Sequence, residues 1–402
     1  MKTINRWAIL ITSCLINLCI GSMYAWSALA APMATELGLS GAGDLAIVFS
    51  ISNAVGFITM IIGGKLNDKY GPRWVMFTGG AMFGIGMFTC GYAQSVTHLI
   101  LSYGLLLGLG LSMVYGCTIS NTIKFFPDKR GMVGGMTTAF YGISSVIFAP
   151  IADAISNSFG PRATFKILGG VFLVVICAGS LIMQKCPEGY MPEGYVPPVN
   201  SGAKKSNDKT PIEMLKTPIF YVMILMLLAG GTFGMMIISN AKGLAMNMVG
   251  AESATATLFV SVLCLFNTAG RLVAGTLSDK LGRINTITIA LIIALVGLVT
   301  LIGASNTASM ALFAVGVVLI GICFGTFMGV FPGFSTDQFG TKNNTVNYGI
   351  MWMGFSAAGL IGPTILTKVY NATGAYTMAF VIAICIAIVG LVMTFAYRKL
   401  AD

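Results

Sequence analysis

Short polar breaks divide this sequence into apolar runs that are each long enough to cross a lipid bilayer. A bilayer core about 30 Å thick needs roughly 20 apolar residues per helix. Such runs predict twelve spans, at about 7–30, 45–64, 74–93, 98–123, 131–156, 163–184, 217–240, 254–277, 284–303, 307–334, 345–367 and 374–397. The alternating pattern of a membrane β-barrel is absent from the sequence. We therefore predict an all-α membrane protein.

The scarcity of charge excludes most other classes of protein. Only 9% of the 402 residues are charged and 56% are hydrophobic, whereas a soluble domain carries about 25% charged residues. A cytosolic enzyme, a nucleic-acid binder and a disordered chain are thus excluded, and the lipid bilayer is the expected surrounding. The net charge of +10 is typical of basic cytoplasmic loops and does not indicate nucleic acid.

The basic residues also predict an orientation. Of the 23 Lys and Arg residues, 18 lie at the termini or in one set of loops, and four lie in the opposite loops. Basic loops stay on the cytoplasmic side. We expect a multi-pass protein of the cell (cytoplasmic) membrane with both termini in the cytoplasm.

A repeated loop divides the chain into two halves. Residues 64–73 read Gly-Lys-Leu-Asn-Asp-Lys-Tyr-Gly-Pro-Arg, and residues 275–283 read Gly-Thr-Leu-Ser-Asp-Lys-Leu-Gly-Arg. Gly, Asp, Lys and Gly recur at a constant shift of 211 residues, after span two and after span eight. This register indicates a duplicated six-helix unit. We predict pseudo-symmetric halves at 1–185 and 217–402.

The longest polar stretch, 186–216, is expected to be a cytoplasmic linker between these halves. It holds five prolines and a lysine-rich tail that includes Lys204 and Lys205. A short interfacial helix is expected near Ile212–Lys216. A lipid-binding role for the lysines is a weaker alternative to a solvated linker.

The repeated loops are also candidate gating elements. An Asp at a helix end can accept hydrogen bonds from the N-terminus of a neighbouring helix and pair with Arg or Lys. We expect Asp68, Arg73, Asp279 and Arg283 to hold the cytoplasmic side closed in this way.

Arg271 is the one formal charge deep within a predicted span. It lies eight residues before Asp279, about 12 Å from the cytoplasmic surface at 1.5 Å per residue. A charge at that depth is costly and is expected to face the bundle interior. The planar guanidinium suits a carboxylate held by two hydrogen bonds. The spans offer almost no acid to pair with it, so we expect a substrate carboxylate there, with a structural ion pair as the alternative.

Asp153 is the only acid in the predicted spans that is a candidate for an ion pair with Arg271. It lies 22 residues after Gly131 on an outward-running helix, about 33 Å along it, so we expect it at the outer mouth. It is a possible proton relay.

Other side chains at similar depth are candidates for the substrate site. Asn267 lies one turn before Arg271 and shares its face, so its amide could orient the guanidinium, bind a substrate hydroxyl or join two helices. The expected aromatic walls come from spans one, four, five, ten and eleven, at Tyr24, Tyr115, Tyr141, Phe324, Trp352 and Phe355.

These features resemble the major facilitator superfamily. Its loop signature, G-x-x-x-D-[RK]-x-G-[RK], is similar to both repeated segments, and the resemblance extends over twelve spans with a central loop. It implies a secondary transporter whose halves rock about a site near the middle of the membrane.

Several stretches further resemble the oxalate:formate antiporter family and its monocarboxylate-transporting relatives. They are Tyr24-Ala-Trp26, Val114-Tyr115-Gly116, Phe126-Pro127-Asp128-Lys129-Arg130-Gly131, Tyr141-Gly142, Asn267 to Arg271, and Asn347-Tyr348-Gly349.

The chain departs from the oxalate carriers at four positions. Those carriers hold a dianion between the span-eight arginine and a lysine, and the position of that lysine is Phe355 here. A Trp and a Tyr of span ten are Phe324 and Met328, and a Gln before the span-one Tyr is Met23. The expected cavity therefore has one cation and fewer hydrogen-bond donors.

This charge difference favours a monocarboxylate of the lactate, pyruvate, formate and acetate class. A dicarboxylate against one Arg would leave a buried negative charge. The alternatives are an oxalate:formate-type dicarboxylate antiporter and a membrane carboxylate sensor that does not transport. Both proton symport and anion exchange are open, although an unpaired Arg271 favours exchange.

No catalytic or metal-binding pattern is evident. The chain has one histidine, His98, and nine cysteines without a C-x-x-C pair. We expect no enzyme activity, no metal and no cofactor. The expected partners are a carboxylate, protons and lipid, and we expect a functional monomer.

Overall fold

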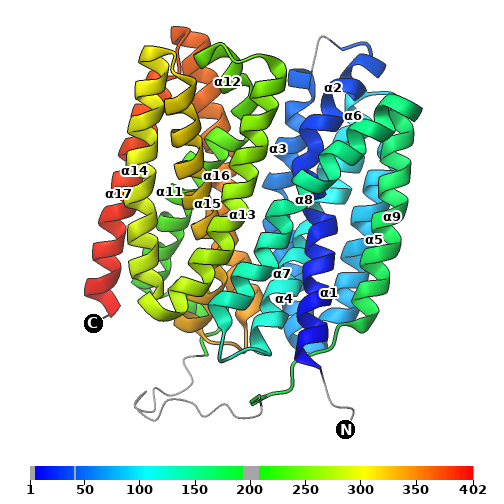
Figure 1. The fold of residues 1–402 in the computed structure, drawn as a ribbon. Coiled ribbons are helices and arrows are strands. Elements are labelled where there is room, and N and C mark those ends of the chain that lie inside the picture. The colour runs from blue at the N-terminus through cyan, green and yellow to red at the C-terminus, as the bar shows by residue number, and fades with distance from the viewer. Residues whose placement is uncertain (1–4, 40–41, 193–207, 402) are drawn as a thin grey trace.

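The computed structural model describes residues 5–39, 42–192 and 208–401, and helix is the regular structure in these ranges. Helices from the first half of the chain form one bundle and those from the second half form another beside it (Figure 1). This arrangement confirms the all-α fold predicted from the apolar runs. The exact boundaries of the two halves stay a prediction.

Within residues 5–39 and 42–192, nine α-helices build the first bundle, and several of them join end to end into single spans. Short 3₁₀ turns occur at Gly21–Ala25 and Ala42–Leu45, and a π-helical stretch occurs at Ile100–Leu107. The helices are α1 (Arg6–Ile20), α2 (Trp26–Glu36), α3 (Ala46–Ala54), α4 (Gly56–Tyr70), α5 (Pro72–Cys90), α6 (Val96–Leu99), α7 (Gly108–Lys124), α8 (Arg130–Phe159) and α9 (Pro161–Ile182).

The second bundle has longer, less interrupted helices. They are α11 (Pro218–Ile238), α12 (Ala241–Val249), α13 (Ser253–Leu281), α14 (Arg283–Thr307), α15 (Met310–Phe339), α16 (Asn344–Thr373) and α17 (Thr377–Ala401).

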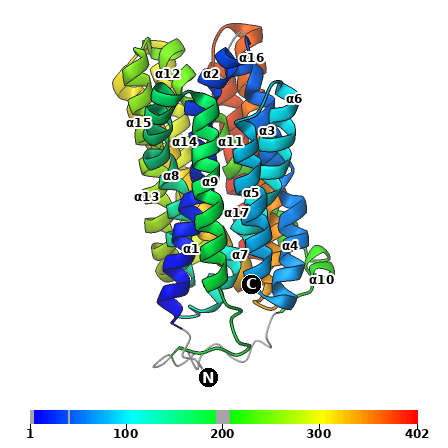
Figure 2. The same cartoon turned by 90° about the vertical axis from the view of Figure 1, so that its right-hand side faces the viewer.

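In the described residues, eleven helical segments are long and apolar enough to cross a membrane. The twelfth predicted span, 74–93, corresponds to α5, which has 19 residues and begins with Pro72 and Arg73. Helix α5 packs against α7 and α9 and runs alongside α9 (Figure 2). Because α5 packs among the other helices of the first bundle, we assign it to the predicted span 74–93.

The first predicted span is not one continuous helix. The 3₁₀ turn at Gly21–Ala25 separates α1 from α2, which extends to Glu36. A side chain at Gly21 would overlap the Tyr141 carbonyl of α8. The turn thus lies at a close approach of backbones that the apolar pattern alone does not reveal.

Both termini lie at the same end of the bundles (Figure 1), which we call the terminus end; the opposite one is the far end. About half of the predicted linker, residues 193–207 with Lys204 and Lys205, lies outside the described residues. Where the description resumes, the Asp208 carboxylate accepts hydrogen bonds from the backbone N–H groups of Thr341 and Lys342, at 2.8 and 3.1 Å. The short helix α10 (Pro211–Leu215) follows, near the position predicted for it.

Candidate functional site

The two copies of the repeated loop have the same backbone form. Helix α4 ends at Gly71 with φ of +91°, and α13 ends at Gly282 with φ of +86°. A residue with a Cβ adopts such angles only with strain. The glycines therefore explain why the repeat keeps its shape in both halves.

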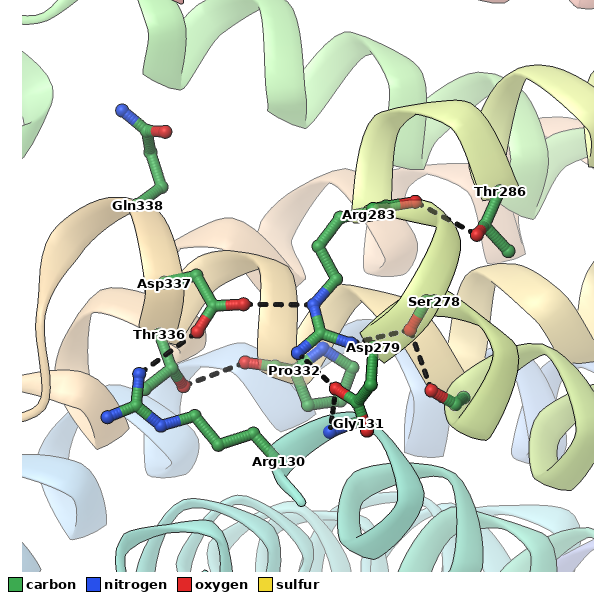
Figure 3. Close-up of polar contacts among 12 residues, drawn as sticks. Arg130, Gly131, Ser278, Asp279, Arg283, Thr286, Pro332, Thr336, Asp337 and Gln338 are labelled. Atoms are coloured by element: carbon green, nitrogen blue, oxygen red, sulfur yellow. Dashed lines mark hydrogen bonds and ion pairs between the residues drawn. The ribbon is translucent and has the colours of Figure 1, made fainter. Parts of the chain in front are cut away.

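The second copy bonds across the two bundles. One Asp279 oxygen accepts from the backbone N–H of Gly131 and the other from that of Met132, each at 2.9 Å. These N–H groups open α8, whose helix dipole favours a carboxylate at that point. Arg283 holds the same carboxylate at 2.7 Å, and Figure 3 shows this arrangement. Asp279 thus joins α13 of the second bundle to α8 of the first.

Asp337 extends the network of Figure 3. It pairs with Arg283 at 2.9 Å and with Arg130, from the first bundle, at 3.0 Å. Two carboxylates and two guanidinium groups therefore alternate where α8, α13, α14 and α15 meet at the terminus end.

The first copy of the repeated loop makes the equivalent contact in the opposite direction, from the first bundle to the second. Asp68 accepts from the Thr345 hydroxyl at 2.9 Å and from the Val346 N–H at 3.4 Å, in the first turn of α16. It also pairs with Lys124 at 2.9 Å. Both aspartates therefore contact the start of a helix in the opposite bundle.

Arg73 differs from Arg283 in its partner. Its Nε atom donates to the Met183 carbonyl at 3.4 Å, at the end of α9 in its own bundle. Pro72 places Arg73 one residue later than its counterpart, which turns it by about 100° on a helix of 3.6 residues per turn. Arg73 therefore contributes to packing within the first bundle, and Lys124 is the cation beside Asp68.

Glycines bring α8 and α13 into backbone contact beside this network. A Cβ on Gly275 would lie 2.6 Å from the Gly131 oxygen and 2.8 Å from the Gly135 Cα. Any side chain at Gly275 must therefore push the two bundles apart at the terminus end.

We expect Gly275→Val to lower the initial uptake rate at least tenfold, because the bundles can no longer close there. A cysteine introduced at the terminus end should also react faster with a water-soluble maleimide. The control is Gly303→Val, where a Cβ would meet only a Leu312 methyl at 3.6 Å. Equal rates for the two valine variants would contradict this role for the contact.

Arg271 lies deeper, on α13, at the seam between the bundles. Its side chain is 1% exposed. The Nε atom donates to Asn267 Oδ1 at 3.1 Å, and one terminal nitrogen donates to the Thr138 carbonyl of α8 at 2.9 Å. The other terminal nitrogen has no hydrogen-bond partner among the described residues. None of the ion pairs in the described ranges includes Arg271.

Three tyrosines surround the guanidinium. Its carbon lies 5.8 Å from the centre of the Tyr141 ring, and Tyr24 and Tyr115 line the same cavity as Arg271. The rings of Tyr24 and Tyr115 contact that of Tyr141 edge to face, at 5.2 and 5.1 Å. Arg271 is thus a buried cation with one free donor group in an aromatic setting.

Arg271 lines a narrow cavity between the bundles. About 20 Å³ is open to the centres of water molecules, which is room for about one water. The cavity therefore fits only a small molecule unless the bundles move. Its lining residues are Tyr24, Ser52, Asn53, Leu111, Ser112, Tyr115, Tyr141, Arg271, Met328, Trp352 and Phe355.

Most of the predicted site residues line this cavity, and two lie behind it. Asn267 lies on the preceding turn of α13 and orients Arg271 through its hydrogen bond to Nε. Phe324 is fully buried, and its ring centre lies 6.1 Å from that of Phe355. The ring centres of Trp352 and Phe355 lie 4.4 Å apart, and the two rings form the cavity wall on the side of α16.

Sequence reasoning missed the polar part of the lining. Ser52, Asn53 and Ser112 are short side chains of a kind that often occurs in apolar helices. The one available signal was the three-residue spacing of Ser112 and Tyr115, which places both on one face of α7.

Asp153 is outside the cavity. It is exposed near the C-terminal end of α8. The charged group that interacts with it electrostatically is Lys242 of α12. No three His, Cys, Asp or Glu side chains of the described residues gather as a metal site.

Two helical bundles with a central cavity and cross-bundle contacts at one end define a class, the polytopic membrane transporters with two pseudo-symmetric halves. The model of the Major Facilitator Superfamily matches residues 11–363. The chain therefore belongs to the major facilitator superfamily, as its repeated loops indicated.

Its relatives agree with the resemblance seen in the sequence. The uncharacterized MFS-type transporter YhjX of Escherichia coli K12 is 29% identical over 87% of this chain and 85% of its own length. The oxalate:formate antiporter of Oxalobacter formigenes is 28% identical over 98% and 92%. Human monocarboxylate transporter 11 is 25% identical over 85% and 72%.

A solved structure supports the fold. The proton:xylose symporter XylE has a TM-score of 0.77 at 14% identity, and the match covers 97% of this chain and 95% of that one. At this identity the likeness concerns the fold alone.

Proposed function

We propose that this protein is a secondary transporter of small monocarboxylates, of the lactate, pyruvate, formate and acetate class. The observation that carries the proposal is the free guanidinium nitrogen of Arg271, which is buried beside the cavity and has no hydrogen-bond partner among the residues described. A carboxylate in the cavity would complete its hydrogen bonding and neutralise its charge.

The charge of the cavity argues for one carboxylate per substrate. Arg271 is the single charged residue in its lining. A monocarboxylate makes the occupied cavity neutral, and a dicarboxylate leaves a net negative charge that costs several kcal/mol in a buried site. The apolar ring of Phe355 lines the cavity as well and offers no second cation.

The second candidate is exchange of oxalate for formate, because the Oxalobacter relative has that name and matches nearly the whole chain. Uptake by proteoliposomes of radiolabelled lactate, oxalate and xylose separates the candidates. We expect lactate uptake at least tenfold above that of oxalate and no uptake of xylose. Equal oxalate uptake would favour the second candidate, and uptake of xylose alone would refute carboxylate transport.

The cross-bundle contacts support a proposal of transport by alternating access. Asp68, Asp279 and Arg283 close the terminus end, which we propose is the cytoplasmic one, and Arg73 supports the first bundle beside them. Entry then occurs from the far end, and release requires that these hydrogen bonds and ion pairs break.

We expect the transporter to exchange one anion for another. Proton symport is the alternative, and Asp153 is the candidate proton relay for it. The lining of the cavity contains no carboxyl group, so a transported proton must use a group elsewhere or the substrate itself. Asp153 is the acid nearest in sequence to the cavity-lining part of α8.

If Asp153 is the proton relay, Asp153→Asn should remove the stimulation of lactate uptake by an inward proton gradient. The reason is that an amide cannot take up the proton. Lactate exchange without a gradient serves as the internal reference in the same proteoliposomes. An unchanged response to the gradient would exclude Asp153 as the relay.

A further inference from the structure

Three short polar side chains line the cavity on the side of the first bundle. Ser52 and Asn53 come from α3, and Ser112 comes from α7. They share the cavity with Arg271 and carry no charge. The cavity therefore has a cationic end and a neutral hydrogen-bonding wall.

The orientation of the Asn53 amide is determined by its partner. Its Nδ2 atom donates to the Phe49 carbonyl at 2.9 Å, and only the amide nitrogen can donate to a carbonyl. Oδ1 is therefore left as an acceptor. The Ser52 hydroxyl donates to the same carbonyl at 2.8 Å, so its oxygen also remains able to accept.

The Ser112 hydroxyl makes no hydrogen bond within the described residues, and Ser112 is only 4% exposed. It thus offers both a donor and an acceptor at the cavity. Together, Asn53 and Ser112 present the complement of a hydroxyl group, which donates one hydrogen bond and accepts others.

The spacing along α7 relates this wall to Arg271. Ser112 and Tyr115 are three residues apart, which is about 4.5 Å along a helix, and Tyr115 lines the same cavity as Arg271. A short acid with its carboxylate on Arg271 would extend its other end toward Ser112 and Asn53.

We propose that Asn53 and Ser112 form a second, uncharged subsite that selects monocarboxylates bearing a hydroxyl group. The inference rests on the proposed function and narrows its substrate class. A hydroxyl would donate to Asn53 Oδ1 and accept from Ser112. An alkyl group would leave both atoms to water, and a second carboxylate would meet the Asn53 oxygen without a counter-charge.

The test compares butyrate with 2-, 3- and 4-hydroxybutyrate in proteoliposomes. One net hydrogen bond contributes about 0.5–1.5 kcal/mol, so we expect kcat/KM for the preferred hydroxybutyrate to exceed that of butyrate by about two- to twelvefold. Asn53→Leu and Ser112→Ala should each lower this ratio toward one.

Ser120→Ala is the matched control, because Ser120 is a buried serine of the same helix that lies outside the cavity lining. It should keep the wild-type ratio. A wild-type ratio of one for every isomer, or an unchanged ratio in both subsite variants, would overturn the subsite while leaving carboxylate transport intact. Absence of uptake for all four acids would overturn the proposed function as well.

Discussion

Arg271→Gln is expected to lower monocarboxylate uptake by at least about 100-fold. The carboxylate would enter a buried cavity whose lining has no other cation, and an uncompensated buried charge costs about 3–5 kcal/mol. A difference of 1.4 kcal/mol corresponds to a factor of ten in affinity. The measurement is the initial rate of radiolabelled lactate uptake into proteoliposomes.

Two variants separate a role in binding from a role in folding. Arg271→Lys keeps the charge but loses the planar fork that contacts Asn267 and Thr138, so we expect an intermediate loss of about tenfold. Lys368→Gln removes an exposed positive charge on α16 and should transport like the wild type. Since Arg271 has no carboxylate partner in the part of the chain that the structure describes, its Gln variant should also keep the wild-type Tm. Full transport by Arg271→Gln would contradict the assignment.

Phe355→Lys is expected to shift the preference strongly toward dicarboxylates. Phe355 lines the same cavity as Arg271, so a lysine there would add a second cation. A dicarboxylate would then make the cavity neutral, and a monocarboxylate would leave one positive charge uncompensated. We expect the ratio of oxalate to lactate uptake to rise at least tenfold.

The control for this change is Phe355→Leu, which removes the ring without adding charge and should keep the preference for lactate. Both variants are assayed by competition of unlabelled oxalate against labelled lactate. If oxalate competes no better in Phe355→Lys than in the wild type, the charge of the cavity does not select the substrate.

The sequence was sufficient to predict the fold because the hydrophobic runs and the repeated loop are strong signals. A bilayer requires about 20 apolar residues per helix, so the spans could be counted directly. The break at Gly21–Ala25 was missed because it depends on how closely α1 approaches α8. Helix α12 was missed because it is short and follows directly on an apolar run.

Arg271 was predictable because a lone charge within a span requires an explanation. Its hydrogen bond to Thr138 was not, since a backbone carbonyl carries no sequence signal. Asn53 and Ser112 are common residues whose placement depends on how α3 and α7 face the cavity. Arg73 occupies the matching place in the repeat, yet one inserted proline changes its partner.

The central claim is that the substrate carboxylate binds the free nitrogen of Arg271. The most direct test is a structure of the protein with 2-bromopropionate, whose bromine locates the molecule by anomalous scattering. We predict a carboxylate oxygen within about 2.7–2.9 Å of that nitrogen and the bromine in the cavity lined by Tyr115 and Trp352. Bromine density elsewhere, with Arg271 turned toward a carboxylate of the protein, would contradict the account.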